Sequence, residues 1–286
     1  MIKNYLKLSK FGIVFLVLLT TLLGYILGPN FSYSVLCFLI AGIYWVSSGS
    51  FILNQASEHL LDSQMNRTKN RPIPKGVVSP DAARILGWLS VLLGLFLLMY
   101  VNILSVLLAV ITILLYNFFY TLRWKKKYPY GAVFFGAIPG AMPVVIGYSA
   151  NTSSILSIEC GYLFLIMFLW QIPHFWSLAF HYKKDYSQAK IPVLPIYFGE
   201  DKTFFHIGLY TLSYVGLALL APLFLNTSFI YLIIALPLCL KILFEYYCFY
   251  RQKNWLPFFS WLNISLLVFL SVPFLDQKMI SFYLSF

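Results

Sequence analysis

Charged side chains are scarce in this sequence. Only 10% of its 286 residues are Asp, Glu, Lys or Arg, and 60% are hydrophobic, whereas a soluble domain carries about a quarter charged residues. Apolar runs of roughly 18 residues or more recur along the whole length, and each is long enough to cross a bilayer as a helix. This composition excludes an ordinary soluble domain. It indicates a polytopic membrane protein, with residues 1–286 forming a single domain embedded in the lipid bilayer.

Four further absences narrow the function and the location. The four cysteines form no CxxC pair, which argues against a disulfide framework or a zinc site. The net charge of +11 is accompanied by no basic amphipathic helix and no RNA-binding motif, so nucleic acid is not an expected partner. The first apolar run, residues 11–27, lacks a small-residue cleavage site and is expected to stay as a helix. The lack of an Arg/Ser-rich presequence favours a bacterial plasma (inner) membrane over a mitochondrial one.

Hydropathy predicts an all-α protein with nine transmembrane helices. They lie near residues 11–28, 35–60, 82–100, 103–122, 131–150, 160–181, 205–224, 228–249 and 257–275. Lysine and arginine occur at the amino terminus and in the connections after the second, fourth, sixth and eighth spans, and the other connections contain neither. Because basic loops stay in the cytoplasm, the pattern predicts a cytoplasmic amino terminus and a carboxyl terminus on the opposite face.

Three polar residues end the second predicted span. Asn54, Glu58 and Asp62 are four residues apart, so a helix places them on one face. Carboxylates at membrane depth are costly and normally face a cavity or a partner, which makes them candidates for a functional site. The alternative is that the helix ends by Ser57, which would leave both acids as ordinary solvated residues.

A basic run follows at once, containing Arg67, Lys69 and Arg71. By itself such a run would indicate only that this loop lies on the cytoplasmic side of the membrane or contacts anionic lipid. Next to two carboxylates and an amide oxygen, which suit Mg²⁺, the basic side chains could hold a diphosphate, arginine in bidentate fashion. The combination is suited to releasing diphosphate from an allylic ester whose hydrocarbon tail lies in lipid.

The stretch "NQASEHLLD" followed by "MNRTKNRPIP" resembles the first signature of the UbiA-type intramembrane prenyltransferases. The resemblance implies a bundle of nine helices around a central, cytoplasmic-facing cavity. It further implies that Asn54, Glu58 and Asp62 bind Mg²⁺ and diphosphate, and that Arg67 and Arg71 contact the diphosphate. Gln55 stands where many members carry a further aspartate.

A second polar region points to one branch of this family. Members that prenylate aromatic acceptors carry a second acidic motif, and here His174, His181 and Asp185 fall at its acid positions. The segments "WQIPHFW", "KDY" and "AKIPVLP" within residues 170–195, and residues 120–148, resemble the members that farnesylate haem. The resemblance implies that farnesyl diphosphate donates the prenyl group and that haem B accepts it. Water must then be kept from the allylic cation, and we expect the loop at 182–204 to act as a lid that excludes it.

The same resemblance assigns further roles. His174, His181 and Trp176 would contact the porphyrin, with His174 either an iron ligand or a polar residue hydrogen-bonded inside the bundle. The alternative for His181, at a helix end beside Lys183, is a position at the membrane interface without a haem contact. Lys184 would contact the diphosphate, and Asp185 would be a further Mg²⁺ ligand.

The end of the fourth span holds two more candidates. Tyr120 is expected near the allylic carbons, where an aromatic face stabilises a developing carbocation. Lys125 either only keeps its loop on the cytoplasmic side of the membrane or binds a haem propionate.

Two other functions remain open: a prenyltransferase with an aromatic or quinone-precursor acceptor, and a non-enzymatic haem transporter or chaperone. A downstream haem-modifying or oxidase-assembly partner is also conceivable from the sequence.

Overall fold

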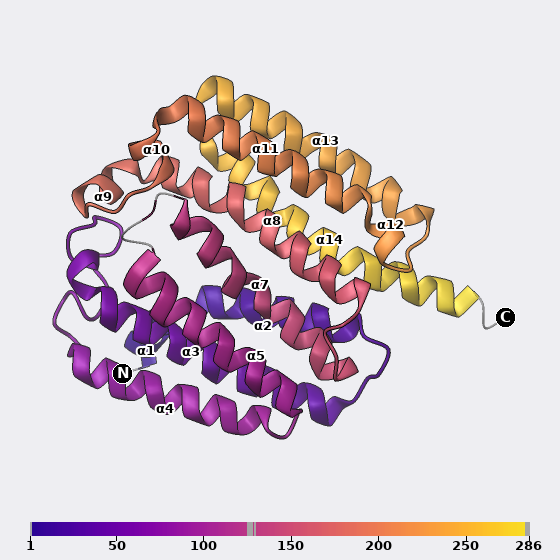
Figure 1. Ribbon diagram of the computed structural model, residues 1–286, viewed down its shortest axis with the longest axis horizontal. Coiled ribbons are helices and arrows are strands. Elements are labelled where there is room, and N and C mark those ends of the chain that lie inside the picture. Colours follow the sequence, from indigo (N-terminus) through magenta and orange to yellow (C-terminus); the bar gives the residue numbers. More distant parts are fainter. Residues whose placement is uncertain (1, 125–127, 129, 284–286) are drawn as a thin grey trace.

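The computed structural model describes residues 2–124, 128 and 130–283 (Figure 1), and within them the regular secondary structure is entirely helical. The elements are, in chain order, α1 (Ile2–Leu8), α2 (Phe11–Ile26), α3 (Tyr33–Asp62), α4 (Pro80–Leu98), α5 (Ile103–Ile113), the π-helix η1 (Leu114–Trp124), α7 (Gly131–Thr152), α8 (Ile158–His181), α9 (Lys183–Gln188), α10 (Leu194–Tyr197), α11 (Gly199–Leu219), α12 (Ala221–Phe224), α13 (Phe229–Gln252) and α14 (Trp255–Tyr283).

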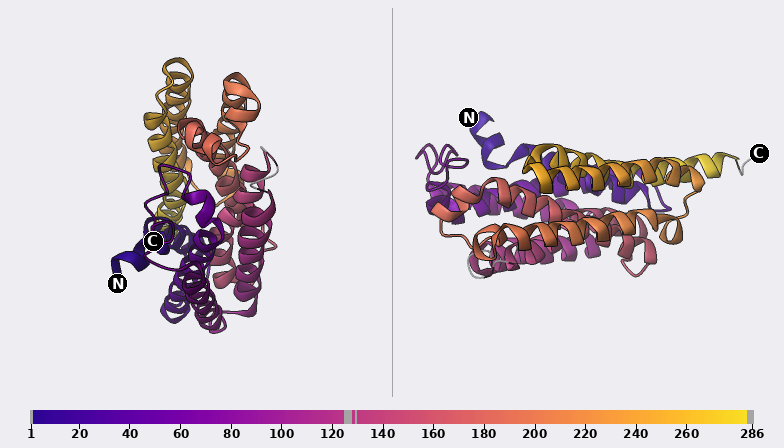
Figure 2. Two further views of the ribbon diagram at one scale, coloured as in Figure 1. Left: turned by 90° about the vertical axis from the view of Figure 1, so that its left-hand side faces the viewer. Right: turned by 90° about the horizontal axis from the view of Figure 1, so that it is seen from above.

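The long helices run side by side along one axis of the bundle (Figure 2). Helices α2 to α7 form one half in Figure 1, and α8, α11, α13 and α14 form the other. Each predicted span overlaps one of these helices, and the all-helical membrane fold is confirmed. The fourth span is divided between α5 and η1, and the seventh runs from α11 into α12. With α5 and η1 taken as one span, seven of the described helices are long and apolar enough to cross a membrane by length and composition. The number nine stays a prediction, because α2 has only 16 residues and α11 begins with a charged turn.

Helix α3 is longer than a membrane span requires. Its amino end is capped by the Ser32 side chain, which accepts from the backbone N–H of Val35, and it continues for 30 residues to Asp62. A helix of that length extends about 45 Å, whereas the hydrocarbon core of a bilayer is about 30 Å thick. The helix therefore does not end by Ser57, and both acids lie in its last turns.

Close packing of α3 against α4 fixes the position of those turns. A Cβ atom on Gly49 would lie 2.6 Å from the carbonyl oxygen of Gly87, and one on Gly94 would lie 2.6 Å from the oxygen of Gly42. Only glycine allows the two backbones to approach so closely. Any larger residue at these positions would push α4 away from α3.

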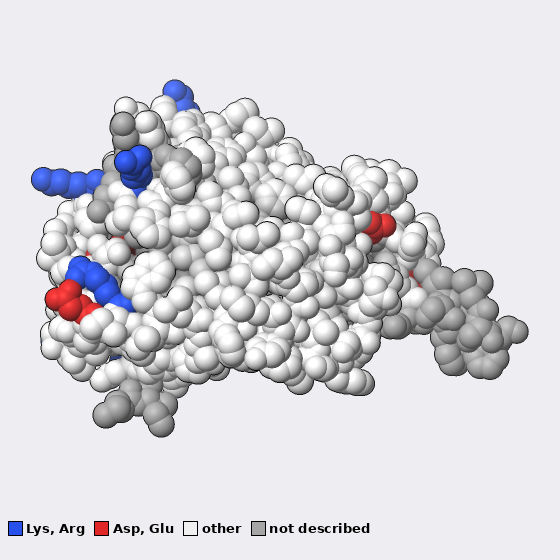
Figure 3. Space-filling view, turned by 60° about the horizontal axis from the view of Figure 1, so that its bottom comes forward, with Lys and Arg blue, Asp and Glu red and all other residues white. Residues whose placement is uncertain are grey.

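One end of the bundle gathers the basic loops. The segment 63–79, α9 and α10 lie together at the left of Figure 1, and the described carboxyl-terminal end of α14 lies at the right. Lys and Arg side chains gather toward the same left-hand end of the face in Figure 3. A small hydrophobic cluster that includes Met65, Tyr186 and Ile191 packs the segment 63–79 against α9 and the residues after it. The two long loops thus form one structure over this end of the bundle.

Candidate active site

The polar stripe of α3 faces a cavity of 180 Å³ at the basic end of the bundle. Asn54, Glu58 and Asp62 all line it, although their exposed fractions are only 2%, 5% and 1%. The remaining lining residues come from five other parts of the chain: Lys10, Ile13, Met65, Arg67, Arg71, Tyr116, Tyr120, Phe175, Leu178 and Tyr186. The structure therefore brings together six of the predicted site residues: the α3 triad, both arginines and Tyr120.

Asp62 holds the basic segment in place. Its Oδ2 accepts from Nη1 of Arg71 at 2.6 Å, and its backbone oxygen accepts from Oγ1 of Thr68 at 2.8 Å. The segment thus turns back over the end of α3 and brings Arg71 into the cavity. Because the pair lies at the cavity wall and Asp62 is nearly fully buried, removing either partner would leave the other charge poorly solvated.

Arg67 connects the two long loops. Its backbone N–H donates to Oδ2 of Asp185 at 3.0 Å, and its guanidinium lies 5.1 Å from the centre of the Tyr182 ring. Asp185, on α9, thereby holds the segment after α3 against the segment after α8. It accepts from a backbone amide there and is not among the residues that line the cavity.

Asn54 is hydrogen-bonded at both ends of its amide. Its Oδ1 accepts from Nζ of Lys10 at 2.8 Å, and its Nδ2 donates to Oγ1 of Thr121 at 3.1 Å. No sequence motif assigns a role to either partner. Lys10 comes from the link between α1 and α2, where it adopts a left-handed backbone conformation with φ 52°. That conformation is uncommon outside glycine and is enriched at functional sites, but the sequence gives no sign of it.

Tyr116 and Tyr120 form an aromatic wall. Their rings stack with centroids 5.6 Å apart and planes inclined by 16°. Both lie in η1, and π-helices are rare and frequently found at functional sites. Oγ1 of Thr121 donates to the oxygen of Tyr116 at 2.7 Å, five residues back. Gly136 on α7 leaves room for the wall, because a Cβ there would lie 2.9 Å from Cε2 of Tyr120.

The predicted haem contacts on α8 occupy separate places. His174 lies between the rings of Trp170 and Phe259, with centroids 4.5 and 4.6 Å away. It is one helical turn from Leu178, which lines the cavity. Nδ1 of His174 is buried and has no hydrogen-bond partner within the described part of the chain.

Trp176 points to a different neighbourhood, where it is fully buried among aromatic rings of α7 and α11 such as Phe134 and Tyr210. His181 stacks on Trp255 at the start of α14, with ring centroids 4.3 Å apart. None of the three predicted porphyrin contacts on α8 lines the cavity as the structure describes it.

Two predicted lysines remain. Lys184 is exposed on α9 and does not line the cavity, so the structure does not join it to the α3 triad. Lys125 lies outside the described residues.

The donor set suits an anionic ligand bound together with a hard cation. Lys10, Arg67 and Arg71 line the same cavity as Glu58 and Asp62, so the formal charges of these five side chains sum to one positive charge. Among residues 2–124, 128 and 130–283, no group of three or more His, Cys, Asp or Glu side chains could hold a metal ion. A cation here would need the amide oxygen of Asn54 and oxygens from water or substrate besides the two carboxylates. That is the usual arrangement for Mg²⁺ at phosphate sites.

Comparison with known proteins agrees with this chemistry. The model of the UbiA prenyltransferase family matches residues 17–267. Protoheme IX farnesyltransferase of Bdellovibrio bacteriovorus is 44% identical over 284 residues, which cover 97% of each chain. The enzyme of the same name from Aquifex aeolicus is 40% identical, over 82% of this chain and 80% of its own.

Solved structures share the fold. A structure of digeranylgeranylglyceryl phosphate synthase has a TM-score of 0.77 at 19% identity, covering 96% of this chain and 98% of its own. A UbiA homologue from Archaeoglobus fulgidus bound to GPP and Mg²⁺ has a TM-score of 0.69 at 17% identity, with 96% and 99% covered.

Proposed function

The chain belongs to the UbiA prenyltransferase family, and we propose that it transfers the farnesyl group of farnesyl diphosphate to a vinyl group of haem B, giving haem O and diphosphate. The identity of 44% over nearly the whole length to a relative named for this reaction supports the choice of donor and acceptor. The structural observation that carries the proposal is the buried Asn54–Glu58–Asp62 face, opposed in one cavity by Lys10 and two arginines.

We assign Asn54, Glu58 and Asp62 as the residues that would hold Mg²⁺ together with the diphosphate. They offer hard oxygen donors on one cavity wall, and the related structure bound to GPP and Mg²⁺ supports metal-dependent transfer in this family. When bound, the ion would offset negative charge on the leaving diphosphate. Asp185 is a weaker candidate for this set, because its Oδ2 accepts from the backbone of Arg67.

The cationic side chains of the cavity act on the leaving group. Arg71 and Arg67 would bind diphosphate oxygens from the segment 63–79, and Lys10 would approach from the opposite side beside Asn54. Charge-assisted hydrogen bonds of this kind strengthen as the allylic C–O bond breaks and its electron pair moves onto the diphosphate. Tyr120, stacked on Tyr116, would present an aromatic face to the allylic cation.

The acceptor completes the reaction. The electron pair of a haem vinyl group forms the new carbon–carbon bond, and water then adds to the porphyrin-side cation and loses a proton. Water must therefore be kept away until the first step is complete. The hydrogen bond between Asp185 and Arg67 closes the two long loops over the cavity, which supports the segment 182–204 as the lid.

We further propose that the basic end of the bundle faces the cytoplasm of a bacterium and that its plasma (inner) membrane holds the protein. The gathering of Lys and Arg at that end supports this orientation, with a cytoplasmic amino terminus and the carboxyl terminus on the other face. Both charged substrates would then reach the cavity from the cytoplasmic side.

The test is a reconstituted assay. The purified protein in lipid, supplied with Mg²⁺, farnesyl diphosphate and haem B, should yield haem O and inorganic diphosphate in equal amounts. Chelation of Mg²⁺ should stop both products. Formation of diphosphate only when an aromatic or quinone-precursor acceptor replaces haem B would instead establish the other branch of the family.

A further inference from the structure

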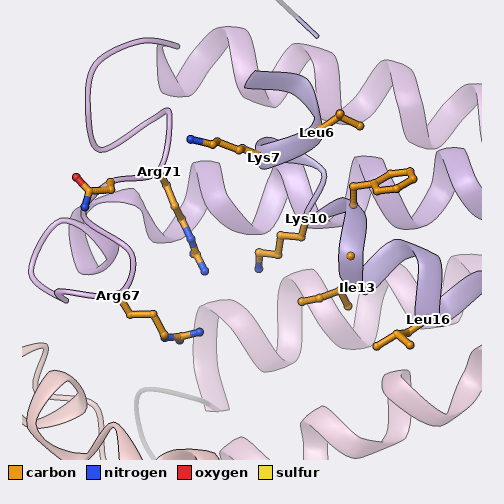
Figure 4. A pocket seen from close by; sticks show the side chains of 10 residues that line it. Leu6, Lys7, Lys10, Ile13, Leu16, Arg67 and Arg71 are labelled. Atoms are coloured by element: carbon orange, nitrogen blue, oxygen red, sulfur yellow. The ribbon is translucent and has the colours of Figure 1, made fainter. Parts of the chain in front are cut away.

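A second depression opens beside the catalytic cavity. It measures 480 Å³ and lies between the amino-terminal helices and the segment after α3 (Figure 4). Its basic lining consists of Lys7, Lys10, Arg67 and Arg71, and its apolar wall comes from the end of α1 and the first turns of α2, including Phe11 and Ile13. We call this depression the amino-terminal groove.

The groove and the catalytic cavity share a wall. Lys10, Ile13, Arg67 and Arg71 line both, whereas Lys7 lines only the groove. Figure 4 shows Lys10, Arg67 and Arg71 pointing into the space between the segment 63–79 and α2. A ligand lying in the groove would therefore present one edge to the reacting atoms and the other to Lys7.

Charge limits what the groove can bind. No Asp or Glu is among the described residues that line it, and its apolar wall contains exposed side chains, with Phe11 45% and Ile13 48% exposed. An exposed apolar wall beside several cations suits a ligand with an apolar body and more than one negative group. The groove also lacks the carboxylate donors that the metal–diphosphate site has.

The rim of the groove is held by a buried side chain. Gln55 is fully buried, and its Nε2 donates to the backbone oxygens of Lys7 at 3.0 Å and Leu8 at 2.6 Å. Gln55 thus points away from the metal–diphosphate face of α3 and caps the carboxyl end of α1. Together with the left-handed turn at Lys10, this cap fixes the backbone that carries Lys7.

We propose that the amino-terminal groove binds a propionate carboxylate of the acceptor porphyrin through Lys7 at its outer rim, whereas the other cations of the groove belong to the wall that it shares with the diphosphate site. This rests on the proposed function, in which haem B is the acceptor. A porphyrin of this kind carries its two carboxylates on one edge and its vinyl groups away from them. A propionate at Lys7 directs the opposite, vinyl-bearing part of the ring toward the wall shared with the catalytic cavity.

The test compares haem B with its dimethyl ester, which has the same macrocycle but no free carboxylates. Both are titrated into the purified protein by absorbance, and both are assayed as acceptors, with wild type, Lys7→Met and Lys75→Met. Lys75 is an exposed lysine of the neighbouring segment that lines neither space, so its variant controls for the loss of one positive charge.

Wild type should bind haem B about 10- to 100-fold more tightly than the ester, the size expected for a hydrogen bond to a charged group. Lys7→Met should abolish this preference and raise the KM for haem B by the same factor. Its kcat and its KM for farnesyl diphosphate should stay at the values of Lys75→Met.

Equal preference for haem B over the ester in wild type and Lys7→Met would overturn the proposal. So would an effect of Lys7→Met that is seen in phosphatidylglycerol vesicles and lost in phosphatidylcholine vesicles, because the groove would then bind lipid headgroups. If wild type makes no haem O, the proposed function is wrong. The binding titration would still show whether the groove binds carboxylates.

Discussion

Nζ of Lys10 lies 2.8 Å from Oδ1 of Asn54, although 44 residues separate them in the sequence. The contact places a cation from the start of α2 directly on the polar face of α3. It also joins the amino-terminal segment to η1, because the same Asn54 amide donates to Thr121. Three elements are thus hydrogen-bonded around one amide at the point where the diphosphate is proposed to bind.

Lys10→Met tests this arrangement by removing the charge while keeping an unbranched side chain of similar length. The KM for farnesyl diphosphate should rise by about 10- to 100-fold, because a hydrogen bond to a charged group contributes about 1.5–3 kcal/mol. Steady-state kinetics with varied farnesyl diphosphate, and inhibition by inorganic diphosphate, would measure it. Lys75→Met is the matched control, and equal inhibition constants for the two variants would remove Lys10 from the site.

Asp62→Asn tests whether the Asp62 carboxylate is needed for the reaction, with little change to the folded structure. The amide keeps the shape of the carboxylate but loses its charge, so both the proposed cation site and the pair with Arg71 are weakened. We expect kcat to fall by about 10²- to 10³-fold, the usual cost of removing one group that stabilises charge in the transition state. Arg84→Met is the control, since it breaks the exposed pair between Arg84 and Asp81 outside the cavity. A kcat within twofold of that control would refute the role given to Asp62.

The sequence predicted the helices well because their signal is local. Apolar runs of membrane length fix where each span lies, and the spacing of Asn54, Glu58 and Asp62 fixes that they share a face. The helical periodicity could not decide whether α3 ends at Ser57 or Asp62. The structure decides it, because α3 continues to Asp62, which is 1% exposed and paired with Arg71.

The features of the site that could not be predicted from the sequence depend on contacts between segments that are distant along the chain. Lys10 reaches the site only through a left-handed turn, and Gln55 faces α1 although it follows Asn54 directly. The family motif located His174 and Trp176 along α8, but it does not say which side of the helix each occupies. The structure places Trp176 in an aromatic cluster with α7 and α11, and His174 against α14.

Asp185 can be tested as a loop contact or as a metal ligand. In the structure its Oδ2 accepts from the backbone N–H of Arg67 at 3.0 Å. Asp185→Asn keeps an oxygen at this position, so it should retain at least about a third of the wild-type rate if the hydrogen bond is what matters. Asp185→Ala, which keeps no acceptor, should lose more. Rates at several Mg²⁺ concentrations provide the readout: a raised Mg²⁺ requirement in Asp185→Asn would establish the carboxylate as a ligand.

Gly136→Ala tests whether the aromatic wall takes part in the reaction. The added Cβ would lie 2.9 Å from Cε2 of Tyr120, so the ring must move away from α7. If its face stabilises the allylic cation, kcat should fall by about 2- to 30-fold, corresponding to a cation–π contribution of about 0.5–2 kcal/mol. Tyr120→Phe keeps the ring and should stay near wild type, while Tyr120→Leu should match Gly136→Ala. Single-turnover rates at saturating farnesyl diphosphate would measure the chemical step, and a Tyr120→Leu rate equal to that of Tyr120→Phe would show that the wall only packs.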